Sequence, residues 1–377
     1  MNINVDRLIG CFSELVIIDS PSYGEKQASD YIKQQLEELG FSISEDQAGA
    51  GHENGCGNLY GFLDGDDALG EPLLLCAHMD TVEPSKGKRA LIKEDGRIIS
   101  AGDTVLGADD ISGISAILEA LRVIEENGIR HRPVEVLFTV AEEVYCGGAA
   151  RFDFSKIKSR QAYVLDLSGP IGTAAFSAPS ILFFTAVVSG KSAHAGFEPE
   201  KGIHAIAAAA DAVSKLTLGH IGNYTTLNIG VIQGGRATNI IPDRCTVGGE
   251  VRSFSHQEAI ELTHAVERQF TMSAAARGAS VAFETSIGCT AYETPEDHLV
   301  IKNFTKACQL ANINVQLVKT FGGSDNNYLA AHGIGGLVVA SGMHQCHSCE
   351  EYTTVSELVQ SARLVVSLMT LNNGGTA

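Results

Sequence analysis

The stretch PLLLCAHMD, residues 72–80, decides the fold. Its five consecutive apolar residues, 73–77, are typical of a strand that is buried on both faces. Such strands occur mainly in parallel sheets that helices cover on both sides. His78 and Asp80 follow the apolar run directly. The stretch therefore predicts a central strand of an α/β sheet, with an imidazole and a carboxylate at its carboxyl end.

Helical and extended patterns alternate around this strand. Ser22-x-x-Glu25 predicts a capping box at the start of a helix that ends before Gly40. Before the middle of the chain, the pattern also predicts strands at 41–44, 59–63, 134–140 and 163–165 and a helix at 111–124. After residue 297, it predicts a helix to 311, a strand at 315–318, a helix at 326–332, a strand at 336–340 and a helix after 354. This order is typical of an α/β layer with a mostly parallel sheet.

The middle of the chain has a different order of elements. Its pattern predicts a strand at 181–189, a helix at 202–216, strands at 225–232 and 244–252, a helix at 256–277 and a strand at 279–287. That is the order of the split βαβ, ferredoxin-like arrangement. We therefore predict a discontinuous α/β domain, residues 1–177 and 290–377, interrupted by an inserted α+β domain at 178–289.

The composition disfavours several classes of protein. Twenty-seven basic residues against 45 acidic ones give a formal net charge of −18, which repels nucleic-acid phosphates and anionic lipids alike. The apolar runs are far shorter than the ~18 residues of a membrane span. The first twenty residues lack the features of a secretory signal, and nine scattered cysteines suit reduced thiols. We expect a cytoplasmic protein without a nucleic-acid or membrane partner.

Metal-binding residue types follow each predicted parallel strand. They are His78 and Asp80 after the first strand, Glu142 and Glu143 after 134–140, Asp166 after 163–165, His344 and His347 after 336–340, and Asp109-Asp110 at the start of the helix at 111. Any one of them has an ordinary explanation, such as a helix cap or a solvated turn. Together, at one edge of a sheet, they favour a site for Zn²⁺, Mn²⁺ or Co²⁺.

At this point the sequence resembles a known family. The motifs are LLLCAHMDTV (73–82), GADD (107–110), FTVAEE (138–143) and GGSD (322–325), with SAHAG (192–196) and GGRATNIIPD (234–243) in the insertion. Motifs in this order are similar to those of the two-metal exopeptidase family of peptidase T, carboxypeptidase G and aminoacylase, and peptidase T-like proteins look closest. The resemblance implies a zinc-peptidase-like catalytic domain with an inserted lid or dimerisation domain.

The resemblance also implies a ligand set for two divalent cations, Zn²⁺ in the first place, with Co²⁺ and Mn²⁺ as alternatives. Asp109 would bridge the two ions. His78 and Asp166 would complete one site, and Glu143 and His347 the other. Glu142 would be the general base, which takes a proton from a metal-bridging water and returns it to the leaving amine. Asp80 would hold the His78 imidazole in its ligating tautomer.

The inserted domain would supply substrate contacts. The resemblance implies that His194 lies near the scissile carbonyl, often across a homodimer interface, and that Asn239 and Arg252 grip polar ends of the substrate. An arginine suits a carboxylate because its guanidinium can bind both oxygens. A surface-loop histidine and an exposed sheet arginine are the alternative interpretations of His194 and Arg252.

Several positions depart from the family pattern or leave alternatives open. Ile111 stands where relatives usually have Lys, and Tyr145 where they usually have Gly. Relatives also often have a cis peptide after the bridging Asp. Cys346-x-x-Cys349 could be a redox pair or part of a zinc site. His344 is an alternative metal ligand.

The expected function is that of a metal-dependent exopeptidase of short peptides, an aminopeptidase of the tripeptidase kind. Asp166 favours this choice by analogy, because relatives with Asp at that ligand position tend to be aminopeptidases or dipeptidases. The alternatives are an N-acyl amino-acid deacylase or a carboxypeptidase with the same two-metal site, and a catalytically silent binding protein of the same fold.

Overall fold

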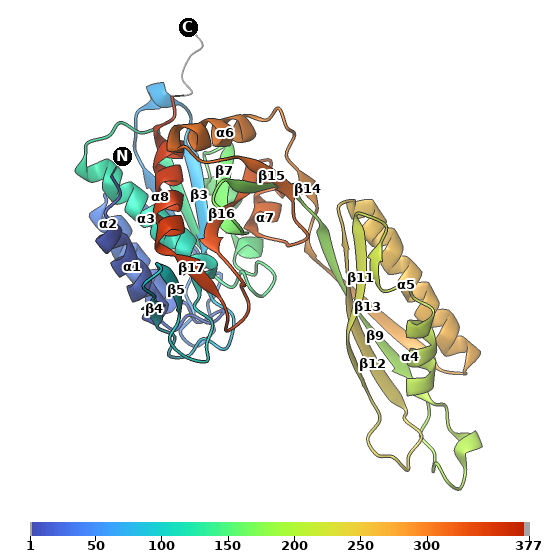
Figure 1. Cartoon of the computed structure of the whole chain (residues 1–377). Helices are drawn as coiled ribbons and strands as arrows, with labels where there is room; N and C mark the ends of the chain where they lie inside the picture. Colours follow the sequence, from blue (N-terminus) through green and yellow to red (C-terminus); the bar gives the residue numbers. More distant parts are fainter. Residues whose placement is uncertain (1, 373–377) are drawn as a thin grey trace. The chain divides into compact units, whose positions relative to one another are not determined.

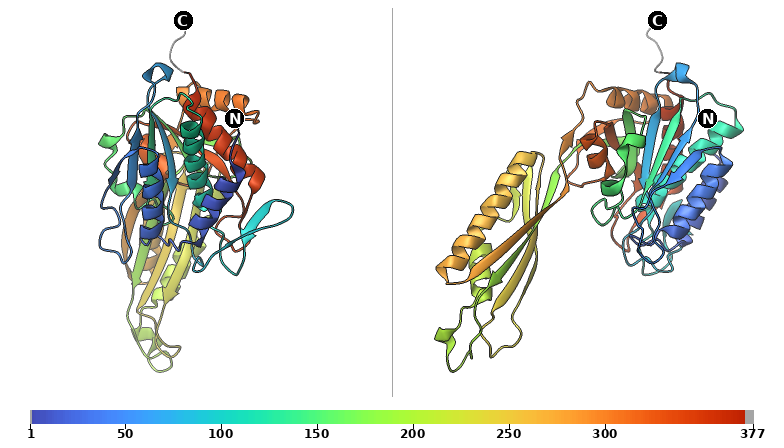
Figure 2. Two further views of the ribbon diagram at one scale, coloured as in Figure 1. Left: turned by 90° about the vertical axis from the view of Figure 1, so that its left-hand side faces the viewer. Right: turned by 180° about the vertical axis from the view of Figure 1, so that it is seen from behind.

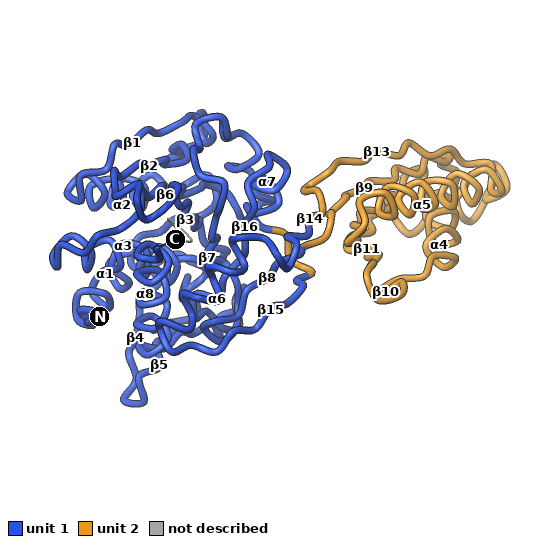
Figure 3. The backbone as a smooth tube through the Cα atoms, turned by 90° about the horizontal axis from the view of Figure 1, so that it is seen from above, with its two compact units in different colours: residues 1–177, 293–320, 324–377 blue, residues 178–292, 321–323 orange. Residues whose placement is uncertain are grey.

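The computed structural model describes residues 2–372 and divides the chain into two compact units (Figure 3). Unit 1 comprises residues 1–177, 293–320 and 324–377, and unit 2 comprises residues 178–292 and 321–323. Unit 2 therefore extends three residues beyond the predicted insertion and takes in a separate short segment. That segment belongs there because Arg252 Nη1 donates to the carbonyl of Phe321, whose ring packs edge-on against Phe254.

Unit 1 contains a nine-stranded, mostly parallel sheet within the described residues (Figure 1). Its order is β1 (Ser42–Glu45), β2 (Leu59–Leu63), β6 (Val134–Thr139), β3 (Leu73–His78), β7 (Gln161–Ser168), β16 (Gly335–Met343), β8 (Thr173–Ala178) and β14 (Tyr292–Glu293), and β15 (Gln316–Lys319) pairs with β8. The neighbours β6, β3, β7 and β16 run parallel. Their carboxyl ends therefore meet at one edge of the sheet.

Helices cover both faces of this sheet (Figure 1). The helices of unit 1 are α1 (Val5–Ile17), α2 (Lys26–Glu38), α3 (Ala108–Glu126), α6 (Leu299–Ala311), α7 (Asp325–Ala331) and α8 (Val355–Thr370), with short 3₁₀ turns at Asp67–Leu69, Ala149–Arg151 and Phe154–Lys156. A small sheet, β17 (Tyr352–Thr354), β5 (Arg97–Ser100) and β4 (Ala90–Ile92), lies beside them. The elements α1, β4, β5, β8, β14 and β17 are additions to those predicted.

Strand β3 shows why the apolar run of the sequence predicts a central position. All six of its residues are buried. Leu73 and Leu75 pack into the cluster that contains α3 and α8, whereas Leu74 and Cys76 pack into the cluster on the other face, with Leu329 of α7. Because side chains alternate along a strand, burial on both faces requires an unbroken apolar run. The prediction of an α/β fold with a mostly parallel sheet is confirmed.

Unit 2 is an α+β domain of the predicted ferredoxin-like order (Figures 1 and 2). Its antiparallel sheet has the order β10 (Gly219–Ile221), β11 (Thr225–Gly234), β12 (Arg244–Ser253), β9 (Ser180–Ser189) and β13 (Ser280–Cys289). Helices α4 (Ala205–Ser214) and α5 (His256–Ala276) pack on one face, and a 3₁₀ turn lies at Pro199–Lys201. No helix within residues 2–372 is both long and apolar enough to cross a bilayer.

One local prediction is wrong. Helix α2 begins at Lys26, and Glu25 at its N-cap makes no side-chain capping bond. Ser22 Oγ donates instead to Asp80 Oδ2 at 2.6 Å, and Glu25 Oε1 accepts from the backbone N–H groups of Tyr23 and Ala141 at 2.8 Å. The predicted capping box fails because Ser22 bonds to the distant Asp80, and Glu25 bonds to Tyr23 and the distant Ala141 instead of to Ser22.

Candidate metal centre

The predicted site residues of unit 1 lie where four neighbouring parallel strands end. His78 is the last residue of β3, and Asp166 lies in β7. Glu142 and Glu143 follow β6, and His347 lies in the loop after β16. Asp109 lies at the start of α3, before regular helical geometry begins. The sheet order therefore places these residues at one edge, although they are spread over 270 positions of the chain (347 − 78 + 1).

One group of ligand-type atoms contains His78, Asp109 and Asp166, all within 4.8 Å of one another. His78 Nε2 lies 3.0 Å from Asp109 Oδ1 and 3.8 Å from Asp166 Oδ1. The side chain of His78 is only 1% exposed. One imidazole nitrogen and two carboxylate oxygens of this kind could hold a divalent cation.

A second group contains Asp109, Glu143 and His347, again within 4.8 Å. His347 Nε2 lies 3.0 Å from Glu143 Oε2 and 3.4 Å from Asp109 Oδ2. Asp109 thus faces His78 with one oxygen and His347 with the other. This geometry allows a single carboxylate to bridge two cations.

The electrostatics of the two groups fit a pair of cations. Burial raises the pKa of Asp166 well above its usual value, and the negative charges of Glu142 and Asp109 raise it further. Burial alone would also raise the pKa of Asp109, but hydrogen bonds with His347 and His78 outweigh burial and lower it. Glu143 Oε1 is buried and has no hydrogen-bond partner among the described residues. An uncompensated buried carboxylate oxygen is costly, so a cation would stabilise this arrangement.

The two imidazoles respond to the same negative charge. Burial lowers the pKa of His78, but its contacts with Asp109 and Asp80 and the charge of Asp166 outweigh burial and raise it well above its usual value. Hydrogen bonds with Asp109 and Glu143 raise the pKa of His347 to about 10. Carboxylates therefore surround both imidazoles, and this negative environment favours positive charge at the two groups.

Asp80 connects His78 to the segment after β6. Its Oδ1 lies 3.3 Å from His78 Nδ1 and accepts from Glu142 N–H at 2.9 Å, and its Oδ2 accepts from Glu143 N–H at 3.1 Å and from Ser22 Oγ at 2.6 Å. Asp80 is fully buried. His78 Nδ1 also lies 3.0 Å from the backbone carbonyl oxygen of Asp80. Asp80 therefore orients the imidazole through its carbonyl and its carboxylate, and the carboxylate fixes the backbone of two neighbouring acidic residues.

Glu142 belongs to neither of these two groups. Its backbone is fixed by Asp80, and Cys146 Sγ donates to its Oε1 at 3.3 Å. Burial raises the pKa of Glu142 well above its usual value, and the negative charges of Asp325 and Glu143 raise it further. Glu142 is thus next to the ligand-type residue Glu143 but outside both groups that contain Asp109.

The structure also shows supporting residues that the sequence does not reveal. Glu351 is buried and accepts from the backbone N–H groups of Gly107 at 2.6 Å and Asp109 at 2.9 Å, so it fixes the segment that carries Asp109. Ser22 and Glu25 support Asp80 and Ala141. A carboxylate that binds distant backbone N–H groups has no local sequence pattern, so Glu351 could not be found from its neighbours.

The departures from the family pattern leave the ligand groups in place. Ile111 is buried in the core of unit 1. Tyr145 is 61% exposed and has φ of 67°, the left-handed conformation that glycine adopts most easily. The Asp109–Asp110 peptide is cis. Asp110 is directed elsewhere, since its Oδ2 accepts from His78 N–H and its Oδ1 from Gly113 N–H.

The structure does not favour the alternatives near His347. His344 Nε2 lies 2.7 Å from Glu357 Oε1, and His344 belongs to none of the candidate ligand groups among the described residues. Burial raises the pKa of the Cys346 thiol, which disfavours the thiolate that a redox pair needs. Cys346 and Cys349 are both thiols rather than a disulfide.

Two of the three predicted substrate-binding residues lie together in unit 2. His194 pairs with Ile240, and Ala195 N–H donates to the carbonyl of Asn239, so His194 and Asn239 are on adjacent loops. Arg252 lies near the far end of β12, roughly 26 Å along the strand from its start at Arg244 (eight residues of about 3.3 Å). Its guanidinium is paired with Glu250 at 2.8 Å. The structure therefore does not bring Arg252 into one group with the other two.

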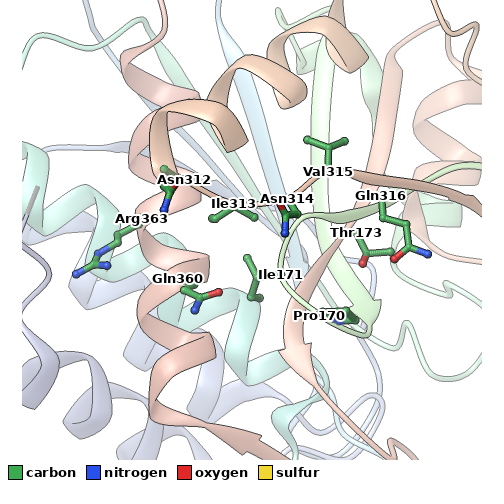
Figure 4. A pocket seen from close by; sticks show the side chains of 11 residues that line it. Pro170, Ile171, Thr173, Asn312, Ile313, Asn314, Val315, Gln316, Gln360 and Arg363 are labelled. Atoms are coloured by element: carbon green, nitrogen blue, oxygen red, sulfur yellow. The ribbon is translucent and has the colours of Figure 1, made fainter.

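A separate cavity of about 780 Å³ lies in unit 1 (Figure 4). Figure 4 shows Ile171, Gln360 and the side chains of residues 312–316 around it. The lining contains carboxamides, a threonine and Arg363, but none of the predicted site residues. The cavity is therefore a different place from the candidate metal centre.

Comparisons with known proteins identify the family and the fold. The profile of the M20 peptidase dimerisation domain matches residues 177–275, and that of peptidase family M28 matches residues 58–179. The uncharacterised protein YqjE of Bacillus subtilis is 35% identical over 97% of this chain and 98% of its own length. A Staphylococcus aureus tripeptidase has a similar structure, with a TM-score of 0.93, 30% identity and 98% of both chains covered. Aminopeptidase PepT of Bacillus cereus has a TM-score of 0.89, 34% identity and the same coverage.

Proposed function

Since this chain belongs to the M20 metallopeptidase family, together with peptidase T and tripeptidases, we propose that it is a two-metal aminopeptidase that cleaves the first residue from tripeptides. The observation that carries the proposal is the position of Asp109, whose two oxygens face His78 and His347 in two separate ligand groups. Glu142 directly precedes Glu143 and belongs to neither of these two groups, so its carboxylate is available as the base.

We assign His78 and Asp166 to one cation, Glu143 and His347 to the other, and Asp109 to both. Imidazole and carboxylate donors suit Zn²⁺, with Co²⁺ and Mn²⁺ as alternatives. When bound, the cations would supply Lewis-acid activation of the scissile carbonyl and of the attacking water. The buried, unpartnered Glu143 Oε1 supports this assignment.

The residues of the chain divide the remaining work. Glu142 takes the proton from the attacking water and transfers it to the leaving amine. Asp80 contacts Nδ1 of His78 and the backbone N–H of Glu142, so it fixes the positions of the proposed base and of one proposed ligand relative to each other. A general base of this kind contributes about 10²- to 10⁴-fold in rate.

Substrate contacts come from unit 2 in this proposal. His194 and Asn239 lie on adjacent loops and bind polar groups near the scissile bond, supplied by the second subunit of a homodimer. The dimerisation-domain match supports this arrangement. Arg252 binds the carboxylate of the peptide by exchanging its present partner, Glu250, for the substrate. A cytoplasmic location is supported by the nine cysteines, all of them thiols.

The experiment compares three substrate types with purified protein that has been loaded with Zn²⁺, Co²⁺ or Mn²⁺. Free tripeptides, the same peptides with blocked N-termini, and N-acyl amino acids are tested in parallel. We expect hydrolysis of the free tripeptides alone, because the aminopeptidase needs the free amine. Glu142→Ala, with its metal content measured, is the control for catalysis by this site.

Two outcomes would contradict the proposal. Hydrolysis of N-acyl amino acids but not of tripeptides would favour the deacylase. Full activity in Glu142→Ala would show that Glu142 is not the base and that this site does not catalyse the reaction. For the dimer, His194→Ala mixed with a second inactive variant, Glu142→Ala, should regain activity if the neighbouring subunit supplies His194.

A further inference from the structure

A third group of ligand-type atoms lies beside the proposed base. It consists of Glu142, Cys146 and Asp325, whose ligand atoms lie within 4.8 Å of one another. It shares no member with the two groups that contain Asp109. Cys146 Sγ donates to Glu142 Oε1 at 3.3 Å, so the thiol and the carboxylate already touch.

Asp325 provides the independent evidence for a ligand here. It is 2% exposed, and its Oδ2 accepts from Thr139 Oγ1 at 2.5 Å. Its Oδ1 is buried and has no hydrogen-bond partner in residues 2–372. A buried carboxylate oxygen without a donor is destabilising unless a positive group compensates it. The same carboxylate lies in reach of Cys146 and Glu142.

The chemistry of the three donors selects the ligand. One sulfur and two carboxylates suit cations that accept thiolate, such as Zn²⁺ and Cd²⁺, and disfavour Mg²⁺ and Ca²⁺, which prefer oxygen alone. Binding needs no oxidant: the S–H bond of Cys146 breaks, its proton goes to solvent, and the sulfur bonds to the cation.

We infer that a third Zn²⁺ or Cd²⁺ ion binds Glu142, Cys146 and Asp325 and inhibits the enzyme. The inhibition rests on the proposed function, because the ion occupies the carboxylate that we assign as base. An occupied Glu142 cannot accept a proton from water. Because the ion forms only coordination bonds, we expect it to bind reversibly. A chelator that removes it should then restore activity.

The test is a Cd²⁺ titration of the chelator-treated, full-length protein. We expect three bound equivalents, with the thiolate-to-Cd²⁺ charge-transfer absorbance arising with the third. Tripeptide hydrolysis, relative to the same protein at two equivalents, should fall about 100-fold at the third. In Cys146→Ser, the third equivalent and the absorbance should both be lost, and activity should stay at its own two-equivalent level.

The double variant Cys346→Ser/Cys349→Ser is the matched control, because those thiols lie near His347 and one of them is exposed. It should behave like the wild type. If the absorbance disappears in this control and persists in Cys146→Ser, the ion binds the other cysteines and the inference is wrong. Asp325→Asn should weaken the third equivalent at least tenfold, and unchanged affinity would remove Asp325 from the site.

Failure of this inference can be told apart from failure of the proposed function. A protein that is inactive with Zn²⁺, Co²⁺ and Mn²⁺ but binds a third Cd²⁺ through Cys146 would contradict the peptidase and keep the metal site. An active protein with only two equivalents and no thiolate absorbance would keep the peptidase and overturn the third site.

Discussion

Replacement of Asp80 by Asn tests how the site is held together. The Asp80 carboxylate has two pairs of contacts, Oδ1 with Glu142 N–H and His78 Nδ1, and Oδ2 with Glu143 N–H and Ser22 Oγ. Asparagine has the same shape but presents one oxygen and one NH₂ group. The NH₂ group must therefore face one of these two pairs.

The structure decides which pair is lost. In the Oδ1 position, the NH₂ group would face two donors, whereas in the Oδ2 position the Ser22 hydroxyl can turn round and accept. We therefore expect the second orientation, in which only the bond from Glu143 N–H is lost. A bond to a charged acceptor is worth about 1.5–3 kcal/mol. Because Glu143 is a proposed ligand, this loss corresponds to a decrease of about 10- to 100-fold in metal affinity.

The assay measures bound metal against free Zn²⁺, together with kcat and KM for a tripeptide. Ser22→Ala is the matched control, because it also removes one hydrogen bond from Asp80 but leaves Glu143 N–H paired. Both variants should lose stability to a similar degree, and only Asp80→Asn should lose metal. Equal loss of metal in both, or wild-type metal affinity in Asp80→Asn, would refute the reasoning.

Four further predictions concern single side chains. Glu142→Ala should keep both cations and lose about 10²- to 10⁴-fold in kcat, measured by metal analysis and tripeptide turnover. Asp109→Ala should lose both cations, whereas Asp166→Ala should lose one, which the metal stoichiometry decides. Glu351→Gln should leave the N–H group of Gly107 or Asp109 without an acceptor and should therefore lower the affinity for metal. The reactivity of the nearby Cys346 thiol should stay unchanged, as a control for the fold of this loop. Unaltered metal affinity would contradict the role of Glu351. Burial lowers the pKa of Lys88 from 10.5 to about 8, so between these pH values the unfolded chain binds more protons than the folded chain. The free energy of unfolding should therefore rise with pH in this range, by up to about 3 kcal/mol. Denaturation of Lys88→Met at several pH values should show a smaller rise.

The parts of the fold that the sequence predicts share a physical cause. The apolar run before His78 and that at 134–140 form adjacent parallel strands because a strand buried on both faces must be apolar at every position. Periodicity also predicts the split βαβ order of the insertion. Short strands such as β8 and β14 were not predicted, since two to six residues of mixed polarity carry no clear pattern.

Some residues of the candidate site can be predicted from the sequence, whereas others are identified only by hydrogen bonds between distant segments. His78, Asp166 and Glu143 can be selected from the sequence because each lies at the end of a predicted buried strand, where an ionisable residue is costly unless it has a function. Ser22 and Glu25 have the spacing of a capping box, and only the fold shows that their oxygens serve Asp80 and Ala141 instead.

The supports of the site form a connected set across loops. Asp80, after β3, holds the backbone of the two glutamates that follow β6. Glu351, four residues after His347, holds the backbone of Asp109 at the start of α3. Two of the segments that carry proposed ligands, those of Glu143 and Asp109, are therefore fixed by a buried carboxylate from another part of the chain. Asp80 was predicted as a partner of His78, but its bonds to the backbone of Glu142 and Glu143, and the role of Glu351, were not, because a carboxylate that accepts from a distant backbone N–H has no local sequence pattern. The same bonds hold several carboxylates close together at this edge of the sheet.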